Sequence, residues 1–409
     1  MTTYQSNFAG YVAYKAQSAL GSQATGGSGK ILRVTGGTVG KLTKAAIQSK
    51  EIRQDAQPVK GRHGLQATAG GPYSCELSLQ GLDDIMLAIM RGAWDTEITK
   101  TQSDFTSLTT GAHTIVMASG NPITMGFRVN DVIQCQNLSD AANNGTNFRI
   151  TALSSTTITV AETLVVNAVA DTTCSVIRRG RKIINPAAGS LVNTYFTIEE
   201  YLADLDTSRT FTDCFWKSIK FSMAPNGLVM AEPSFVGTGQ FEVDTGVGSP
   251  ILTSPTLSAN VPLAALDATL RLGGVDVADI TSFDLTIDNG AVAPAVVGAK
   301  ISPTVMPGLV QVSMNLTVLQ MDMSYISGHL NETGYSLSFR AAANMAEPKD
   351  FISINVPNFT LGTADVSPPS TAGGAKTVTI SVPAALIGHD STGSGYDDTT
   401  VSIQVSNNS

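Results

Sequence analysis

The chain has 409 residues, of which 42% are hydrophobic and only 14% charged, with a net charge of −8 and a pI near 5.0. This acidic balance argues against a general nucleic-acid-binding protein, which needs a basic face to neutralise phosphates. No stretch approaches 18 consecutive apolar residues and no basic-then-apolar leader begins the chain, so the sequence predicts a soluble protein made in the cytoplasm.

The N-terminal half begins with a polar, glycine-rich stretch, and we expect residues 1–29 to form an arm that reaches a neighbour or stays mobile. From Lys30 onward, short segments of alternating polar and apolar residues follow one another, as in YSCELSLQG. Alternation is typical of half-buried strands, and the many Gly and Pro residues between segments indicate turns. The sequence therefore predicts a mainly β protein.

One segment breaks the strand rhythm. In LDDIMLAIMRGAW, from Leu82 to Trp94, apolar residues recur at the spacing of one helix face. Asp83 and Asp84 lie at its start, where the helix dipole favours negative charge. We therefore predict a short helix here and interpret both carboxylates as structural.

Residues 100–183 have a different texture, with short strands joined by Gly, Asn and Asp turns and no helical pattern. We expect a small β-barrel or Ig-like β-domain inserted into a loop of the host domain. At its exit, the basic run Arg178, Arg179, Arg181 and Lys182 is predicted to be a solvated junction.

The host domain resumes with the strand FTIEEYL and a hairpin that turns at Pro225–Gly227. A Ser/Pro-rich linker is predicted at 245–262. The first domain thus comprises 30–99 with 184–244, and the second comprises 263–409.

The second domain repeats the layout of the first. In both, a strand leads into a long turn-rich excursion, then a clean alternating strand, a short helix and further strands. The excursions span about 50–73 and 287–309, and MDMSYISGHL stands where the first helix stood. We therefore expect a duplicated fold.

No convergent set of catalytic groups is present. His63, His113, His329 and His389 occur singly, and none of the common nucleophile, phosphate-loop or zinc motifs occurs. No loop has the spacing of an EF-hand calcium site. We predict no catalytic, cofactor-binding or metal-binding residues.

Adjacent carboxylates at Glu199 and Glu200 are predicted to point to opposite faces of a strand, which rules out paired acid–base work. The cysteines Cys75, Cys135 and Cys174, together with Cys214, form no CxxC pair and lie near no histidine at a ligand spacing. We expect reduced, mostly buried thiols without a disulfide framework.

Three stretches resemble the major tail tube proteins of siphophages, which have long, non-contractile tails. The first runs from QSKEIRQDAQ to LDDIMLAIMRGAW, the second is FTIEEYL…APNGLVMAEPSFVG, and the third is DNGAVAPAVVG…LNETGYSLSF. Within the first, the matching residues are Ser49, Glu51, Ile52, Arg53, Asp55, Asp83, Asp84, Gly92 and Trp94.

The resemblance implies a structural virion protein, assembled in the host cytoplasm, whose domains join into rings that stack around a DNA channel. Family rings hold six domains, so two tube domains per chain imply a trimer with pseudo-sixfold symmetry. Its expected partners are other copies of itself, the tape measure protein, and terminator and baseplate proteins. DNA is expected to pass without specific binding, and no membrane segment is expected. Because a domain the size of residues 100–183 cannot fit inside a DNA-width channel, we expect the inserted domain to lie outside the tube.

Two alternatives stay open from the sequence. One is another phage structural protein, such as a baseplate or decoration protein. The other is a β-rich adhesin or carbohydrate-binding module.

Overall fold

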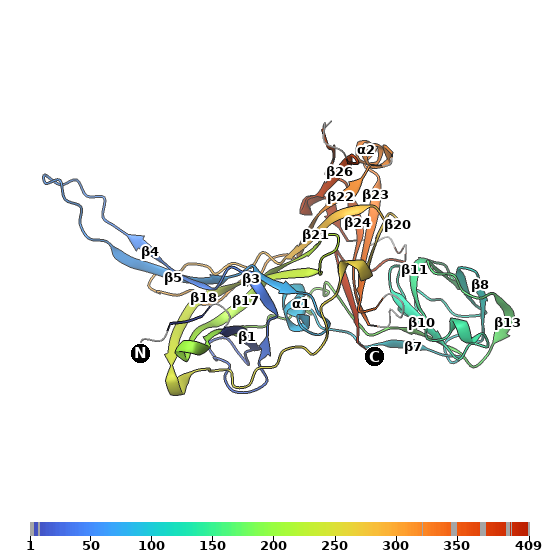
Figure 1. Ribbon diagram of the computed structural model, residues 1–409, viewed down its shortest axis with the longest axis horizontal. Coiled ribbons are helices and arrows are strands. Elements are labelled where there is room, and N and C mark those ends of the chain that lie inside the picture. The colour runs from blue at the N-terminus through green and yellow to red at the C-terminus, as the bar shows by residue number, and fades with distance from the viewer. Residues whose placement is uncertain are drawn as a thin grey trace.

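The computed structural model describes residues 4–6, 9–320, 322–344, 350–368, 374–389, 393 and 395–407. Its strands form three sheets in which neighbouring strands run antiparallel (Figure 1). Figure 1 shows a central body, a long hairpin that extends from it to the left, and a separate lobe on the right. No helix in the described ranges is both long enough and apolar enough to span a membrane.

The largest sheet has 13 strands drawn from both halves of the chain. They are β1 (Gly10–Ala16), β2 (Lys30–Ile31), β3 (Val34–Gly37), β4 (Lys41–Ile47), β5 (Arg62–Gly70), β6 (Tyr73–Glu76), β16 (Phe196–Leu202), β17 (Thr207–Met223), β18 (Met230–Thr245), β21 (Ile280–Asp288), β22 (Gln311–Leu319), β25 (Thr363–Val366) and β26 (Thr377–Val382).

The right-hand lobe is an eight-stranded sheet in the order β13-β8-β9-β12-β11-β10-β14-β7, with its own apolar core. Its strands are β7 (Ile98–Lys100), β8 (Leu108–Gly111), β9 (Thr114–Met117), β10 (Val132–Gln136), β11 (Asn147–Leu153), β12 (Thr157–Val160), β13 (Asn167–Asp171) and β14 (Ser175–Arg178).

The third sheet has seven strands and belongs mainly to the second half of the chain. They are β15 (Arg181–Ile184), β19 (Ala268–Leu272), β20 (Val275–Val277), β23 (Gly334–Ala342), β24 (Phe351–Thr360), β27 (Ile387–Gly388) and β28 (Ser402–Ser406). β15 extends across the boundary that the sequence predicted at residue 183, because it pairs with β28 near the C-terminal end.

The helices are α1 (Asp83–Met90) and α2 (Ser324–Leu330). Both lie where the sequence predicts a helix, but α1 ends four residues before Trp94. Arg91 adopts a left-handed conformation with φ of 55°, which caps the helix and stops it there. Single 3-10 turns occur at Ala141–Asn143, Ala203–Leu205, Gly246–Gly248, Ala265–Asp267 and Ala384–Leu386.

The same order of strand pairings occurs in both halves. β2-β1-β16-β17 in the first half corresponds to β20-β19-β23-β24 in the second. Likewise, β4-β5-β18-β17 corresponds to β21-β22-β26-β25. β17 is continuous and takes part in both runs, whereas its counterpart is divided at Leu361–Gly362 into β24 and β25.

One apolar core holds the two halves together. α1 packs against β17, and Trp216 on that strand makes edge-to-face contacts with Tyr14 and Phe235. The core continues without a break into the buried residues of β21, β22 and β26. This continuity arises because β17, at Ser218–Met223, pairs directly with β21.

The prediction of an N-terminal arm is wrong for residues 10–16. They form β1, which pairs along its whole length with β16, and Tyr14 is buried in the core. The sequence GYVAYKA has apolar residues for a strand covered on both sides, and this outweighs the polar glycine-rich residues that follow it.

The segment predicted as a linker, 245–262, lies against the first half. Ile251 and Thr256 accept backbone hydrogen bonds from Gly26 and Ile31 at 3.0 and 2.8 Å, and Leu252 is fully buried. Residues 245–262 are therefore an ordered part of the body, and the division of the chain into domains stays a prediction.

Candidate functional site: a polar sheet face, an extended hairpin and a buried ionic junction

Polar side chains share one side of six strands of the large sheet, namely β17, β18, β21, β22, β25 and β26. We call this side the polar face. The opposite sides of these strands are buried, as with Phe221, Leu285 and Ile380, because successive side chains alternate across a strand. The polar face consists of Ser218, Lys220, Ser222, Glu232, Ser234, Ser282, Asp284, Thr286, Asp288, Gln311, Ser313, Asn315, Thr317, Thr363, Asp365, Thr377, Thr379 and Ser381.

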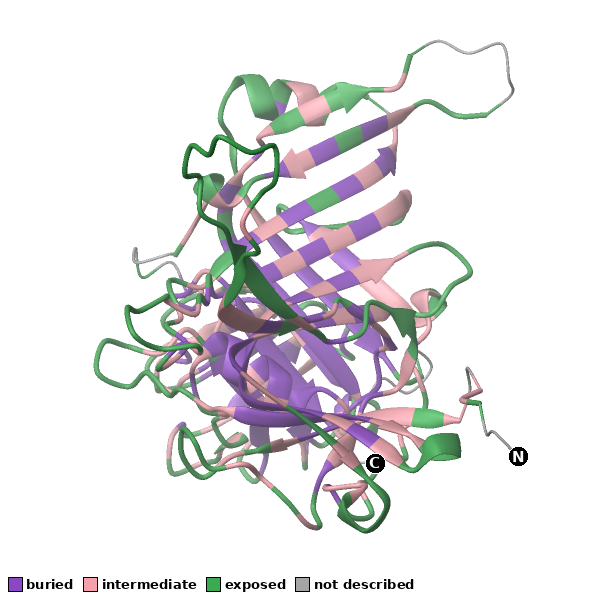
Figure 2. Cartoon of the chain, turned by 90° about the vertical axis from the view of Figure 1, so that its left-hand side faces the viewer, coloured by how far each residue is buried: buried purple, intermediate pink, exposed green. Residues whose placement is uncertain are grey.

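The polar face contains four acidic residues and one lysine, and the remaining side chains are hydroxyls and amides. Lys220 pairs with Asp284 at 3.3 Å across the joint between β17 and β21. The slanted strands in the upper part of Figure 2 show the alternation directly, as buried bands between intermediate and exposed ones. The face therefore carries a net negative charge.

The hairpin of β4 and β5 extends away from the body (Figure 1). Its tip, residues 48–61, has almost no buried side chain, and Ile52 is fully exposed. Arg53 is held by Asp55 at 3.0 Å and by Glu51 at 3.5 Å within the tip itself. The predicted excursion at 50–73 is thus shorter than expected, because its second part forms β5.

The second excursion, which follows β21, crosses the large sheet toward β5 and β18. Lys300 accepts a backbone hydrogen bond from Gln66 at 2.8 Å, and Ser302 donates one to Thr238 at 2.8 Å. Val297 and Leu309 are nevertheless exposed by 105% and 82%. This loop therefore lies across the first half and presents apolar side chains outward.

The basic run at 178–182 is not the solvated junction that the sequence predicts. Lys182 is 4% exposed and lies between Asp131 of the inserted lobe, at 2.8 Å, and Asp397 near the C-terminus, at 3.0 Å. Burial raises the pKa of Asp131, and the ammonium of Lys182 opposes that shift. Arg178, also buried, pairs with Asp95 at 2.7 Å.

A second charged contact joins the inserted lobe to the second half of the chain. Arg149 on β11 binds Asp276 through two nitrogens, at 3.0 and 2.9 Å, and also Glu162 at 2.6 Å. Gln404 on β28 adds hydrogen bonds of 2.9 Å to both the N–H and the C=O of Val132. The inserted lobe, which follows α1 of the first half in sequence, therefore contacts the second half of the chain at several points.

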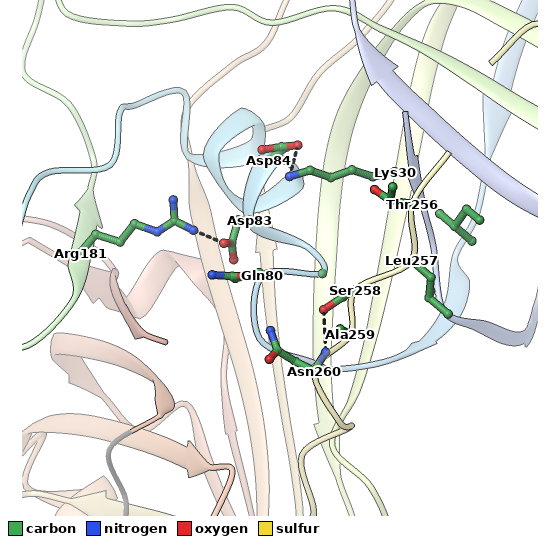
Figure 3. A pocket seen from close by; sticks show the side chains of 12 residues that line it. Lys30, Gln80, Asp83, Asp84, Arg181, Thr256, Leu257, Ser258, Ala259 and Asn260 are labelled. Atoms are coloured by element: carbon green, nitrogen blue, oxygen red, sulfur yellow. Dashed lines mark hydrogen bonds and ion pairs between the residues drawn. The ribbon is translucent and has the colours of Figure 1, made fainter. Parts of the chain in front are cut away.

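Asp83 and Asp84 begin α1, as predicted, and line an open pocket of about 520 Å³ (Figure 3). Asp83 binds Arg181, and Asp84 binds Lys30 at 2.6 Å. Burial raises the pKa of Asp83, and the two cations oppose this shift. Both carboxylates therefore have cationic partners, and these two ion pairs join α1 to β2 and β15. Residues 256–260 complete the lining of the pocket.

Glu199 and Glu200 point to opposite sides of β16, as predicted. Glu199 accepts hydrogen bonds from the backbone of Ile251 and Leu252, at 2.7 and 3.0 Å. Glu200 accepts from Tyr73 at 2.9 Å and pairs with an arginine of β17. Each carboxylate therefore anchors a different neighbouring segment.

The four histidines lie far apart in the fold, on β5, in a turn of the inserted lobe, on α2 and before the C-terminal strand. His329 and His113 bond to backbone carbonyls at 2.8 and 3.0 Å, and His389 bonds to Asp398 at 2.6 Å. In the described ranges, no three His, Cys, Asp or Glu side chains are placed to hold a metal. The four cysteines are buried and unpaired, as predicted.

The comparisons with known proteins agree with this architecture. The sequence matches the family described as phage tail tube protein over residues 8–385, which is nearly the whole chain. A search of curated proteins found no match. The family is a structural one whose members self-assemble into a tube. This chain, mainly β and with two copies of one strand arrangement, belongs to the phage tail tube protein family and is a component of the virion tail.

Proposed function

We propose that the protein polymerises as stacked rings around a central channel that conducts DNA into the host during infection. The observation that carries this proposal is the repeated strand order within a chain that matches the tail tube family over residues 8–385. Two copies of one arrangement per chain favour a ring of three chains with pseudo-sixfold symmetry.

The polar face is the part of the sheet best suited to line the channel. Hydroxyl and amide side chains offer no base-stacking platform, and its acidic residues outnumber Lys220 four to one. A negative wall repels phosphates, so DNA slides past without the counterion release that drives binding. The proposed lumen thus conducts DNA and does not hold it.

We propose that the two excursions make the contacts between stacked rings. The tip at 48–61 and the loop at 289–310 both expose apolar side chains that nothing in the described chain covers, such as Ile52, Val297 and Leu309. Both segments expose apolar side chains, which a neighbouring ring would cover. Tape measure, terminator and baseplate proteins are the further partners that we propose for the assembled tube.

The inserted lobe is proposed to lie outside the tube. It projects from the body on the side away from the hairpin (Figure 1). Residues 100–183 contain no Tyr or Trp, and Phe105, Phe127 and Phe148 are buried. The lobe therefore lacks exposed aromatic platforms, which weakens the carbohydrate-binding alternative.

Negative-stain microscopy of the purified protein tests the proposal. Stacked rings or tubes with a central hole, and threefold averages of single rings, are the expected result. A protein that stays monomeric over a wide range of concentration and salt, or that forms sixfold rings of six chains, would contradict it.

A further inference from the structure

The buried junction at Lys182 brings together three groups that can form a covalent bond. Lys182 on β15 is 4% exposed, and its Nζ lies 2.8 Å from Oδ1 of Asp131 and 3.0 Å from both carboxylate oxygens of Asp397. The three residues come from segments that are far apart in the sequence. An amine, a carboxyl group and a second carboxylate are therefore in mutual contact at a buried point of the fold.

We propose that Lys182 and Asp131 join in an amide cross-link that the folded chain forms by itself, with Asp397 as the proton carrier. This inference goes beyond the proposed function and does not depend on it. A bond forms between Nζ of Lys182 and Cγ of Asp131, and the bond between Cγ and Oδ1 breaks.

The reaction balances without an oxidant or a further reactant. Of the three hydrogens on the ammonium group, one passes directly to Oδ1 of Asp131, which leaves a neutral amine facing a neutral acid. The amine attacks Cγ, and Asp397 moves a second hydrogen from the nitrogen to Oδ1. That oxygen then departs as water, and the third hydrogen remains on the amide.

The surrounding strands hold the reacting groups in place. β15 pairs with β28, so that Lys182 lies opposite Gln404. The side chain of Gln404 bonds to both the N–H and the C=O of Val132, next to Asp131, at 2.9 Å. Well-oriented groups of one molecule reach effective concentrations of about 10⁵–10⁸ M, so this fixed contact favours attack.

Asp131 has the features of the carboxyl group that is attacked. Its side chain is 1% exposed, and burial raises its pKa, which favours the neutral acid, whereas the cations of Lys182 and Arg178 oppose this shift. Its second oxygen, Oδ2, accepts a hydrogen bond from the backbone N–H of Arg128 at 2.8 Å. That N–H stabilises the negative charge that develops on Oδ2 when the amine attacks.

The apolar surroundings favour the linked product. Val132 packs with Ala342 and Phe351, which are fully buried. Charges in such a place are costly to desolvate, and the cross-link replaces two of them with a neutral amide. The carboxylate of Asp397 remains and accepts a hydrogen bond from the new amide N–H.

The cross-link closes a covalent loop over residues 131–182. This loop contains β10 to β14, which make up most of the inserted lobe. The base of the lobe is then fixed by a covalent bond in addition to its ion pairs, and a pull on the lobe cannot separate Asp131 from β15.

Mass spectrometry of the denatured wild type tests the proposal directly. We expect an intact mass one water below that of the unlinked chain. Trypsin cuts only at free lysine and arginine, so the digest should contain a branched peptide that joins residues 129–149 to residues 182–209. Lys220, whose exposed pair with Asp284 is 3.3 Å long, is the internal control and should be cut.

Variants separate the roles of the three groups. Lys182→Met and Asp131→Ala should each have the unlinked mass. Asp397→Asn keeps the contact between Lys182 and Asp131 but removes the proton carrier, so the cross-link should form about 10²–10⁴-fold more slowly. Lys220→Met is the matched control and should remain fully linked.

A wild type with the unlinked mass, in which trypsin cuts after Lys182, would overturn the proposal. This outcome does not depend on whether any variant folds. A branched peptide that contains Asp397 in place of Asp131, or full linkage in Asp397→Asn, would overturn the roles assigned to the two carboxyl groups.

Discussion

Lys182 binds two carboxylates that come from distant parts of the sequence, Asp131 and Asp397, and it is 4% exposed. Removal of one partner from a buried ionic group is costly, because it leaves the other charges without compensation. The position thus fixes the inserted lobe, the strand β15 and the C-terminal segment relative to one another.

Lys182→Met should therefore lower the free energy of unfolding by about 3–5 kcal/mol. Lys220→Met is the matched control, since Lys220 is 40% exposed and its pair with Asp284 is worth about 0–1 kcal/mol. Urea unfolding followed by tryptophan fluorescence measures both. Equal losses in the two variants would contradict the role given to Lys182.

The thiols provide a second prediction at this scale. Burial raises the pKa of Cys75 and of Cys135 to about 12 in each case. At pH 8 almost no thiolate is present at either site, and the thiolate is the reactive form. The native protein should resist iodoacetamide at pH 8, whereas the protein in urea should take up four labels by mass spectrometry. Rapid labelling of the native protein would contradict the burial of these residues.

At the scale of elements, the β4–β5 hairpin separates two roles. Its strands belong to the large sheet, whereas its tip at 48–61 is almost wholly exposed. A deletion that extends from the tip into β5, such as residues 54–70, would damage the sheet together with the tip and could not test the tip alone.

Replacement of residues 48–61 by Asn-Gly tests the tip alone. Ile47 and Arg62 are paired in register, and Asn-Gly is the favoured two-residue hairpin turn, so the strands should keep their pairing. We expect single rings that no longer stack, by sedimentation and microscopy, with an unchanged melting temperature. Replacement of the His113 turn of the inserted lobe by the same dipeptide is the control. Normal tubes from the tip variant would exclude it from ring stacking.

Local patterns predicted some elements well. α1 follows from the spacing of Leu82, Ile85 and Ile89, and the β17–β18 hairpin follows from its Pro-Asn-Gly turn, because both depend on neighbouring residues. β15 could not be predicted in the same way. Its partner β28 lies more than two hundred residues away, and no local signal distinguishes its lysine from a solvated one.

The polar face shows the same limit of prediction from local sequence patterns. Alternation in β21 and β22 predicts that one side of each strand is polar, but only the pairing of β17 with β21 shows that these sides form one continuous surface. The resemblance carried the functional prediction.

At the scale of the whole molecule, charge is distributed unevenly. The acidic residues of the polar face are proposed to keep the channel wall from holding DNA, while the basic hairpin lies apart from it. The sign of this surface is therefore open to a direct test.

Glu232→Lys combined with Asp288→Lys reverses two of the four acidic positions of the polar face. Tubes of this variant should retain short duplex DNA at low salt and release it as salt rises, because phosphate contacts are screened and exchange with counterions. Wild-type tubes should retain none. Co-sedimentation with labelled DNA gives the comparison, and Val169→Lys on the inserted lobe is the control. Equal DNA binding by all three proteins would contradict the placement of this face in the channel.

The ordered segment 245–262 has a kinetic consequence. It ties the two halves together, so the β17–β21 joint forms inside one polypeptide and does not depend on an encounter between two molecules. In the proposed ring of three chains, the contact between the two halves of each chain would be complete before any two molecules meet. Closure of the proposed ring would then require three diffusing bodies in place of six, and its rate should depend less steeply on subunit concentration. On this proposal, a tail could begin to assemble while the protein is still scarce in the infected cell.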